Sequence, residues 1–339
     1  MDQEVSRTVL SVSGLRVDLP VGGGTMHPVD GVSFEVAAGE SLGIVGESGS
    51  GKSLSLKAVL GLLPPGATAA GDLRFALGGD VVRDAERVRG HGVAMVFQEP
   101  MTALNPTMRV GDLIGEAVRA RGRMPRREVR ARVLELMADV GIPEPARRAR
   151  MWPHELSGGL RQRVMIAAAL ATEPELLLCD EPTTALDVTV QAQILELLRR
   201  LREERGLAMV FVSHDLAVVA EVCDRVAVMY AGRLVEVGPV DDVLRSPRHP
   251  YTAALLASAP SFAGGGEALA TIPGSPPDPR RFPEGCRFAA RCAFAQDDCL
   301  TAAHVLVGVD GLRATACIHP ESLPAPQPRV SQTRLEVVA

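Results

Sequence analysis

Eight residues near the start of the chain have the types and spacing of a phosphate-binding loop. They fit the pattern G-x-x-x-x-G-K-S and are Gly46, Glu47, Ser48, Gly49, Ser50, Gly51, Lys52 and Ser53. An apolar run, 41–45, precedes them and a helical pattern follows, which is the context that this motif requires. Glycines let backbone N–H groups turn toward phosphate oxygens, and a helix N-terminus adds partial positive charge. We expect Lys52 to reach the β- and γ-phosphates of a nucleotide and Ser53 to bind Mg²⁺.

Two adjacent carboxylates end an apolar run farther along the chain. Residues 176–179 are Leu-Leu-Leu-Cys, and Asp180 and Glu181 follow directly. A buried strand of this kind would deliver both acids to the edge of the sheet where the phosphate loop also lies. Asp180 suits the Mg²⁺ shell, as in other phosphate-loop ATPases. Glu181 would polarise the water that attacks the terminal phosphate.

A second turn of anion-binding type precedes the helical pattern at 164–170. It consists of Ser157, Gly158 and Gly159, and a serine with two glycines at a helix start can offer N–H groups to an anion. One nucleotide needs only one such loop on its own subunit.

The motifs follow one another in a fixed order along the chain. The order is phosphate loop, Gln98, Leu-Ser-Gly-Gly, Asp180-Glu181, Asp187 and His214. This ordered set resembles the ATP-binding cassette (ABC) family over about residues 8–245. The resemblance implies that ATP is the nucleotide, and that a head-to-tail dimer places Ser157, Gly158 and Gly159 against the ATP of the opposite subunit.

The same resemblance implies the remaining site roles. Gln98 would contact Mg²⁺ or the attacking water, Asp187 would line the dimer seam, and His214 would contact the γ-phosphate. The family usually stacks adenine on an aromatic residue in the first hairpin, whereas this chain has Leu19 at the matching position. His27 is the alternative candidate for that contact.

Four stretches outside these motifs look like those of oligopeptide, dipeptide and nickel importer ATPases. They are residues 98–106, 249–256, 272–278 and 285–292. The resemblance favours ATP hydrolysis that energises peptide uptake, with nickel or another small solute as the alternative cargo. It also implies two transmembrane permease subunits, a second and related ATPase subunit, and an extracytoplasmic peptide-binding protein. The chain itself is expected to lie peripherally on the cytoplasmic face of the cell membrane.

Four of the six cysteines fall in the last quarter of the chain. Their spacing is C-x5-C-x6-C-x17-C, and they are Cys286, Cys292, Cys299 and Cys317. Thiolates bind zinc and iron–sulfur clusters, but the close cysteine pairs of usual zinc sites are missing here. The importer resemblance implies a [4Fe–4S] cluster at these cysteines. Zinc, unligated thiols and disulfides stay open as alternatives.

The alternation of apolar runs and helical patterns predicts an α/β fold with a largely parallel sheet. We expect a phosphate-loop ABC ATPase core with an antiparallel β subdomain and a helical subdomain at about 100–160. The nucleotide-binding domain would span 1–245. A small cysteine-containing domain would span 246–325, and a disordered tail 326–339.

Composition narrows the possible functions further. The 339 residues carry a formal net charge of −5, which argues against a general nucleic-acid binder. A soluble ABC ATPase that acts on nucleic acid or ribosomes is therefore not favoured, and the single cassette agrees. The start shows no secretory signal pattern, and no run of about 18 apolar residues could span a membrane.

Seven arginines between Arg119 and Arg132 form either a solvated helical face or a contact to anionic lipid or another subunit.

Overall fold

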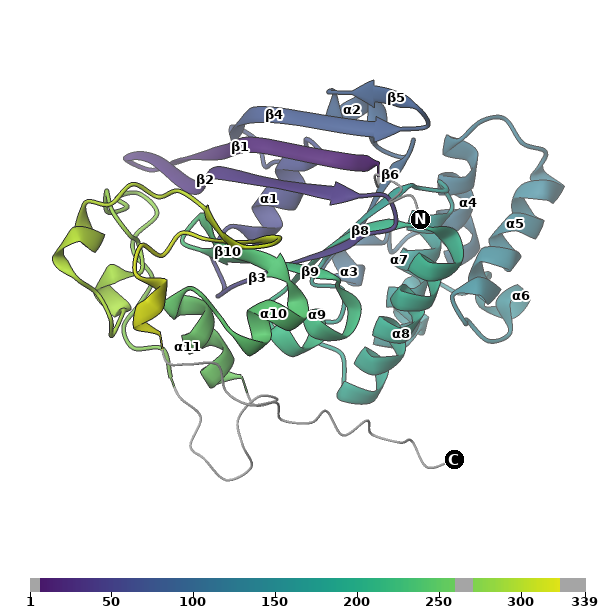
Figure 1. Cartoon of the computed structure of the whole chain (residues 1–339). Helices are drawn as coiled ribbons and strands as arrows, with labels where there is room; N and C mark the ends of the chain where they lie inside the picture. The colour runs from purple at the N-terminus through teal and green to yellow at the C-terminus, as the bar shows by residue number, and fades with distance from the viewer. Residues whose placement is uncertain (1–6, 260–270, 324–339) are drawn as a thin grey trace, which may run out of the picture.

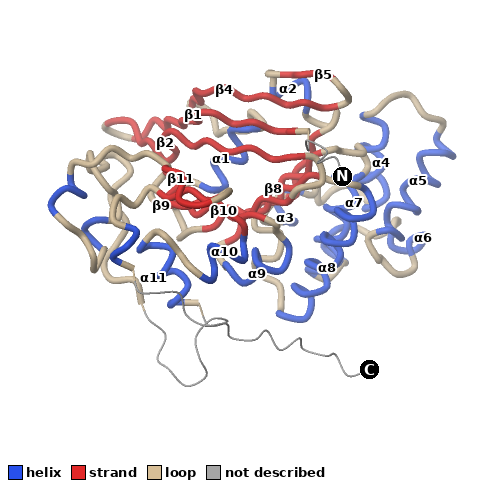
Figure 2. The backbone as a smooth tube through the Cα atoms, in the orientation of Figure 1, coloured by secondary structure: helices blue, strands red, loops and turns tan. Residues whose placement is uncertain are grey.

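Two β-sheets form the framework of the protein, whose computed structural model describes residues 7–259 and 271–323. A four-stranded antiparallel sheet has the order β2-β1-β4-β5, and an eight-stranded sheet has the order β11-β12-β10-β9-β3-β8-β7-β6 (Figures 1 and 2). The strands are β1 (Thr8–Val21), β2 (Gly24–Ala37), β3 (Ser41–Val45), β4 (Thr68–Leu77), β5 (Asp80–Val82), β6 (Val93–Val96), β7 (Leu176–Asp180), β8 (Ala208–Ser213), β9 (Arg225–Tyr230), β10 (Arg233–Pro239), β11 (Val307–Asp310) and β12 (Arg313–Thr315).

Helices cover the large sheet and form a separate lobe beside it (Figure 1). They are α1 (Lys52–Val59), α2 (Ala85–Val88), α3 (Pro100–Ala103), α4 (Val110–Ala120), α5 (Arg126–Asp139), α6 (Pro145–Arg148), α7 (Gly158–Leu170), α8 (Val188–Arg205), α9 (Leu216–Val222), α10 (Val240–Arg245) and α11 (Pro250–Ser258). Short 3₁₀ turns lie at Pro153–Glu155, Ala289–Arg291, Asp297–Leu300 and Pro320–Ser322. None of the helices in the described ranges is long and apolar enough to cross a membrane.

The centre of the large sheet is parallel, as the alternation of patterns predicts. β3 pairs in parallel with both β8 and β9, and β7 pairs in parallel with β8 and β6. All five residues of β7 are buried, because Leu176 and Leu178 face one hydrophobic core and Leu177 and Cys179 face the other. A strand covered on both faces must be apolar at every position. That requirement explains why its sequence shows an unbroken apolar run.

The antiparallel sheet is larger than the sequence indicates. Short apolar runs at 10–17 and 32–36 predict two strands, and these runs are the middles of β1 and β2, which form a long hairpin. β4 adds to the other edge of β1 and was not predicted. Most of its first seven residues are exposed or half-buried, so the segment lacks the apolar alternation that marks a strand. The hairpin and α1 share one hydrophobic core with the upper face of the large sheet.

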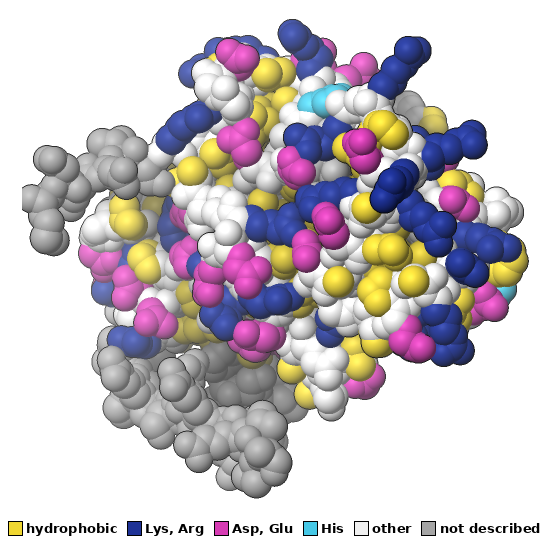
Figure 3. Space-filling view, turned by 90° about the vertical axis from the view of Figure 1, so that its right-hand side faces the viewer, with side chains coloured by type: hydrophobic (Ala, Val, Ile, Leu, Met, Phe, Trp, Pro, Cys, Tyr) yellow, Lys and Arg dark blue, Asp and Glu magenta, His cyan; other side chains and the backbone are white. Residues whose placement is uncertain are grey.

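Helices α4, α5 and α6 form the helical lobe, within the predicted range 100–160. The apolar face of α5 is buried at Val129, Val133, Leu136 and Met137, all at the expected helical spacing. The arginines noted in the sequence lie along α4, α5 and the loop between them, and most are exposed. Figure 3 shows many Lys and Arg side chains on this side of the molecule. Two of them, Arg121 and Arg132, pair with Glu173.

The cysteine-bearing region adds two strands to the large sheet. β12 pairs antiparallel with β10, and β11 pairs with β12. Neither β10 nor β12 was predicted; β10 also forms a hairpin with β9, but its pairing with β12 joins residues that are far apart in the chain, such as Glu236 and Thr315. The region from 246 onward therefore shares a sheet with the cassette, and its status as a domain of its own stays a prediction. The predicted tail, 326–339, lies outside the described residues.

Candidate nucleotide and cysteine sites

The phosphate loop connects the central strand β3 to the start of α1. Two neighbours force glycine at position 51, where the backbone adopts a φ of +105°. A Cβ atom there would lie 2.4 Å from the carbonyl oxygen of Pro28 and 2.8 Å from Cε of Met229. Only glycine combines this conformation with so close an approach. The loop is thus packed from behind by β2 and β9, and its geometry is set by the fold.

Lys52 lies inside the loop and is 4% exposed. Its Nζ atom donates to the carbonyl oxygens of Gly46 at 2.7 Å and Glu47 at 2.9 Å. Burial lowers the pKa of the Lys52 ammonium, while the charges of Glu181, Asp180 and Glu47 oppose that shift. Its third contact is the Ser50 hydroxyl at 3.5 Å, and an ammonium that is removed from water and held by neutral oxygens is suited to bind an anion. The residues therefore fit the phosphates of a nucleotide.

Ser53 and Asp180 meet at the end of β7. The Ser53 hydroxyl donates to Oδ1 of Asp180 at 2.6 Å. Burial raises the pKa of the Asp180 carboxyl, and the Ser53 hydrogen bond counteracts part of that effect. Hydroxyl and carboxylate oxygens are ligands that Mg²⁺ prefers. A divalent cation would also favour the ionised form of a buried carboxyl. This pair fits the predicted magnesium site.

Three side chains contact a single carboxylate oxygen of Glu181. Its Oε2 atom accepts from the Thr184 hydroxyl at 2.8 Å and from Nε2 of Gln98 at 3.3 Å, and Nδ1 of His214 lies 3.3 Å away. Three predicted residues from the ends of β6, β7 and β8 are thus brought together. Glu181 has a φ of +44°, a strained conformation for a residue other than glycine, and such strain is common at functional sites.

Thr184 was not predicted as a site residue. No local pattern marks its hydroxyl, because the contact with Glu181 depends on the turn between β7 and α8. Its hydrogen bond to Glu181 is the shortest of the three at that oxygen. The structure therefore adds a fourth side chain to the predicted group.

The second predicted turn lies at the start of α7. Ser157 and Gly158 are exposed, and the Ser157 hydroxyl makes no side-chain hydrogen bond within the described ranges. A Cβ on Gly159 would lie 2.5 Å from Cγ1 of Val190, so this turn packs against α8. Asp187 caps that helix by accepting from the N–H of Val190 at 2.9 Å. Ser157 and Gly158 therefore present a polar surface, and no side chain in the described part of the chain bonds to the Ser157 hydroxyl.

Leu19 lies in β1, near the turn that leads into β2. Pro28, in β2, packs against Gly51 of the phosphate loop. Leu19 is half-buried and pairs across the hairpin with Met26. His27 points its ring nitrogen Nδ1 at Asp18, with 2.6 Å between Nδ1 and Oδ1. Which of Leu19 and His27 contacts adenine stays a prediction.

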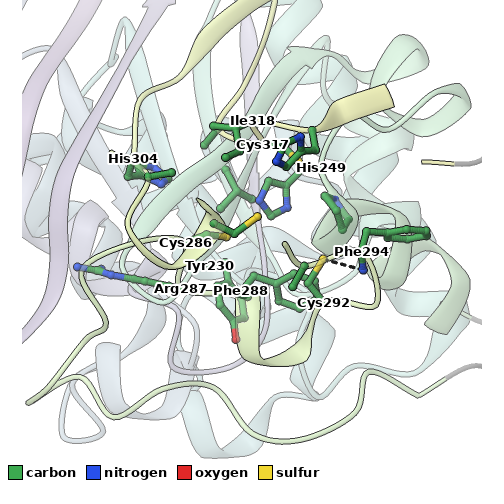
Figure 4. Close-up of a pocket in the computed structure, with 18 of the residues that line it drawn as sticks. Tyr230, His249, Cys286, Arg287, Phe288, Cys292, Phe294, His304, Cys317 and Ile318 are labelled. Carbon is green, nitrogen blue, oxygen red and sulfur yellow. Dashed lines mark hydrogen bonds between the residues drawn. The ribbon is translucent and has the colours of Figure 1, made fainter. Parts of the chain in front are cut away.

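All four late cysteines line one cavity (Figure 4). Figure 4 labels Cys286, Cys292 and Cys317 around it, with Tyr230 and Phe288 beside them. Burial raises the pKa of the Cys286 and Cys292 thiols, and it raises the pKa of Cys317 to about 11. Such thiols become good ligands only when a bound cation stabilises their thiolate form.

The spacing of the thiols tests which group the cavity could hold. Four thiolates bound to one zinc ion at about 2.3 Å would lie only about 3.8 Å apart. No three of these thiols lie within 4.8 Å of one another in the described ranges. Among the described residues the four thiols are therefore not gathered around one single-ion position. A smaller set, Asp298, Cys299 and His319, does fall within 4.8 Å and shares one cysteine with it.

Two family models match the chain. The model for ABC transporters matches residues 29–184, and the model for the oligopeptide/dipeptide transporter C-terminal region matches residues 235–299. The first match contains the phosphate loop and both acids. The second contains most of β10, all of α11 and three of the four cavity cysteines.

Individual relatives agree with the family models. The dipeptide transport ATP-binding protein DppD of Bacillus subtilis is 48% identical over 289 residues, which cover 84% of this chain and 86% of the relative. The oligopeptide transport ATP-binding protein OppD of the same organism is 48% identical over 294 residues, or 85% of this chain and 82% of OppD. A putative peptide import ATP-binding protein of Brucella abortus is 47% identical over 321 residues, or 93% of this chain and 96% of that protein.

Solved structures support the fold of the cassette. The ATP-binding cassette MJ0796, in a dimeric post-hydrolysis state bound to ADP and Pi, matches with a TM-score of 0.60 and 29% identity. That match covers 68% of this chain and 98% of the other. The predicted α/β cassette fold is confirmed. The chain belongs to the ABC transporter family, among the ATP-binding subunits that carry the oligopeptide/dipeptide transporter C-terminal region.

Proposed function

We propose that this chain binds and hydrolyses ATP to energise the uptake of dipeptides and oligopeptides across the cytoplasmic membrane. The observation that carries the proposal is the meeting of Gln98, Glu181 and His214 beside Ser53 and Asp180, in a chain with a peptide-transporter C-terminal region. The names of the relatives, which include dipeptide and oligopeptide transport proteins, support the choice of cargo.

Each side chain has a specific role in this proposal. The loop 46–53 holds the phosphates of ATP, with Lys52 on the β- and γ-phosphates. Ser53, Asp180 and Gln98 hold Mg²⁺, which neutralises phosphate charge when bound. Glu181 orients and polarises the attacking water, and Thr184 holds its carboxylate in place. His214 contacts the γ-phosphate.

The exposed turn of Ser157, Gly158 and Gly159 completes the site of a second subunit. Its unpartnered Ser157 hydroxyl supports a contact made only in a head-to-tail dimer, with Asp187 along the seam. ATP binds the closed dimer better than the open one and so shifts the population toward closure. Hydrolysis reverses that shift. The resulting opening and closing of the dimer would drive two permease subunits between their inward-facing and outward-facing states.

The assembly contains partners that the chain must recognise. We infer two transmembrane permease subunits, a second and related ATPase subunit, and an extracytoplasmic protein that delivers the peptide. The chain would lie peripherally on the cytoplasmic face of the membrane.

The four cavity cysteines, Cys286, Cys292, Cys299 and Cys317, would hold a [4Fe–4S] cluster. The cavity that all four cysteines line is the observation behind this ligand set. The cluster, when bound, would supply bonds that tie the loops of the C-terminal region together. Anaerobically purified protein should contain about four irons per chain. Cys292→Ala should lose them, whereas Cys223→Ala, which removes a buried thiol elsewhere in the core, should keep them. Stoichiometric zinc or no metal would overturn the cluster.

Hydrolysis and transport are tested together in the assembled complex in proteoliposomes. Glu181→Gln should retain ATP binding but lose about 10²–10⁴-fold in turnover, since the amide cannot accept the proton of the water. Glu173→Gln is the control. That acid precedes the first residue of β7, at the end of the strand away from Glu181, and it pairs with Arg121. Uptake of labelled dipeptide should require ATP and fail with Glu181→Gln. Normal turnover of Glu181→Gln, or transport of Ni²⁺ without peptide, would contradict the proposal.

A further inference from the structure

A single arginine joins the cysteine region to the phosphate loop. Arg291 precedes Cys292, and its guanidinium makes a two-point contact with the carboxylate of Glu47, the second residue of the loop. The distances are 2.7 Å from Nη1 to Oε2 and 3.0 Å from Nη2 to Oε1. The Arg291 side chain is 6% exposed and that of Glu47 is 24% exposed. A bidentate pair of this kind, shielded from water, is a strong and directional contact.

The same region also holds the backbone of Glu47. The N–H of Glu47 donates to the hydroxyl of Tyr251 at 2.8 Å. Tyr251 is fully buried in α11 and packs against Tyr230 and Phe288, with ring centroids 4.6 Å and 5.4 Å away. Arg291 itself donates to the Tyr230 hydroxyl at 3.2 Å. Side chain and backbone of one loop residue are thus fixed by elements that follow the ATPase motifs in the sequence.

The Arg291 contact has an electrostatic consequence for ATP. The charge of Glu47 contributes to the pKa of Lys52, so its carboxylate lies within electrostatic range of the ammonium that faces the phosphates. A free carboxylate in this position would repel the negative triphosphate and compete for Lys52. Arg291 offsets that charge and keeps the carboxylate turned toward the C-terminal region.

We propose that Arg291 is a positioning residue for ATP: it neutralises Glu47 and fixes the phosphate loop, so the C-terminal region sets the affinity of the chain for ATP. The inference rests on the proposed function, in that residues 46–53 bind ATP. The segment between Cys286 and Cys292 would thus affect nucleotide binding, although it lies far from Lys52 in the sequence.

The test compares four variants of the full chain by equilibrium ATP binding. Arg291→Gln should weaken ATP binding about tenfold, because a hydrogen-bonded charge pair is lost next to the phosphates. Glu47→Gln should bind ATP more tightly than Arg291→Gln does, since it removes the repelling charge as well as the pair. The double variant should recover to within about threefold of wild type for the same reason. Arg280→Gln is the matched control, because within residues 7–259 and 271–323 the Arg280 side chain pairs with the exposed Asp278 alone.

A structural role alone would give a different pattern. Loss of ATP affinity in Arg291→Gln that Glu47→Gln fails to restore would overturn the proposal, as would unchanged affinity in Arg291→Gln. In the assembled complex the effect should fall on KM for ATP, while kcat at saturating ATP stays within about twofold of wild type. Failure of the wild-type chain to bind ATP would instead refute the proposed function.

Discussion

Replacing Thr184 by valine should lower ATP turnover about tenfold while leaving ATP affinity unchanged. Valine has nearly the same shape as threonine but lacks the hydroxyl that donates to Oε2 of Glu181 at 2.8 Å. A hydrogen bond to a charged acceptor contributes about 1.5–3 kcal/mol. Because about 1.4 kcal/mol corresponds to a factor of ten in rate, complete loss would slow hydrolysis about 10- to 100-fold.

The remaining donors set the effect at the lower end of that range. Nε2 of Gln98 and Nδ1 of His214 both lie 3.3 Å from the same oxygen and can move closer. The Glu181 side chain is 13% exposed, so water can also reach it. The carboxylate therefore keeps partners but loses its shortest one, and with it the orientation needed to act on the attacking water.

The assay measures kcat and KM for ATP in the assembled complex. Thr183→Val is the matched control. It makes the same chemical change at the residue before Thr184, whereas the hydroxyl that donates to Glu181 belongs to Thr184. Turnover of Thr184→Val within about twofold of wild type would refute the positioning role, since the expected loss is larger than that. Equal losses in both variants would show that any change in this turn disturbs the site.

Three further predictions concern metal, dimer and stability. Ser53→Ala should raise the Mg²⁺ concentration for half-maximal ATPase activity at least about tenfold, measured by magnesium titration, because a ligand and the Asp180 partner are both lost. Ser157→Arg should block ATP-dependent dimer closure, seen by light scattering, yet leave ATP binding at Lys52 intact; loss of binding by the same chain would contradict the head-to-tail arrangement. Arg287→Gln should lower the free energy of unfolding by about 3 kcal/mol, because it leaves the half-buried Asp30 without one of its cationic partners. Thermal unfolding checks this value, and a loss no larger than that of Arg280→Gln would contradict it.

The sequence indicates where several predicted site residues lie, because they follow the ends of buried strands; their roles stay predictions. β3, β7, β8 and β9 are covered on both faces, so their apolar runs are unbroken and their ends are recognisable. Parallel neighbours bring those ends to one edge, which is why Ser53, Asp180 and Glu181 meet as expected. The order of motifs then adds Gln98 and His214.

The missed features depend on contacts that no local pattern reveals. β10 and β12 join segments far apart in the chain, and β4 is mostly exposed along its first half. Thr184 reaches Glu181 only through the turn that gives Glu181 its positive φ. Arg291 could be recognised as part of a family-like stretch, but its salt bridge to Glu47 requires the folded arrangement of the C-terminal region.

The phosphate loop is confined by elements from three parts of the chain. Gly51 faces the carbonyl of Pro28 in β2, and a Cβ on Gly46 would lie 2.0 Å from the carbonyl oxygen of Met229 in β9. The hydroxyl of Tyr251 in α11 accepts a hydrogen bond from the N–H of Glu47. The glycines of the motif are therefore needed for these close approaches as well as for phosphate contact. Since one of the three elements belongs to the C-terminal region, a shift of that region must either move the loop or break a buried hydrogen bond. The cavity cysteines and the ATP site are in this sense parts of one packed structure, although the sequence separates them by more than 200 residues.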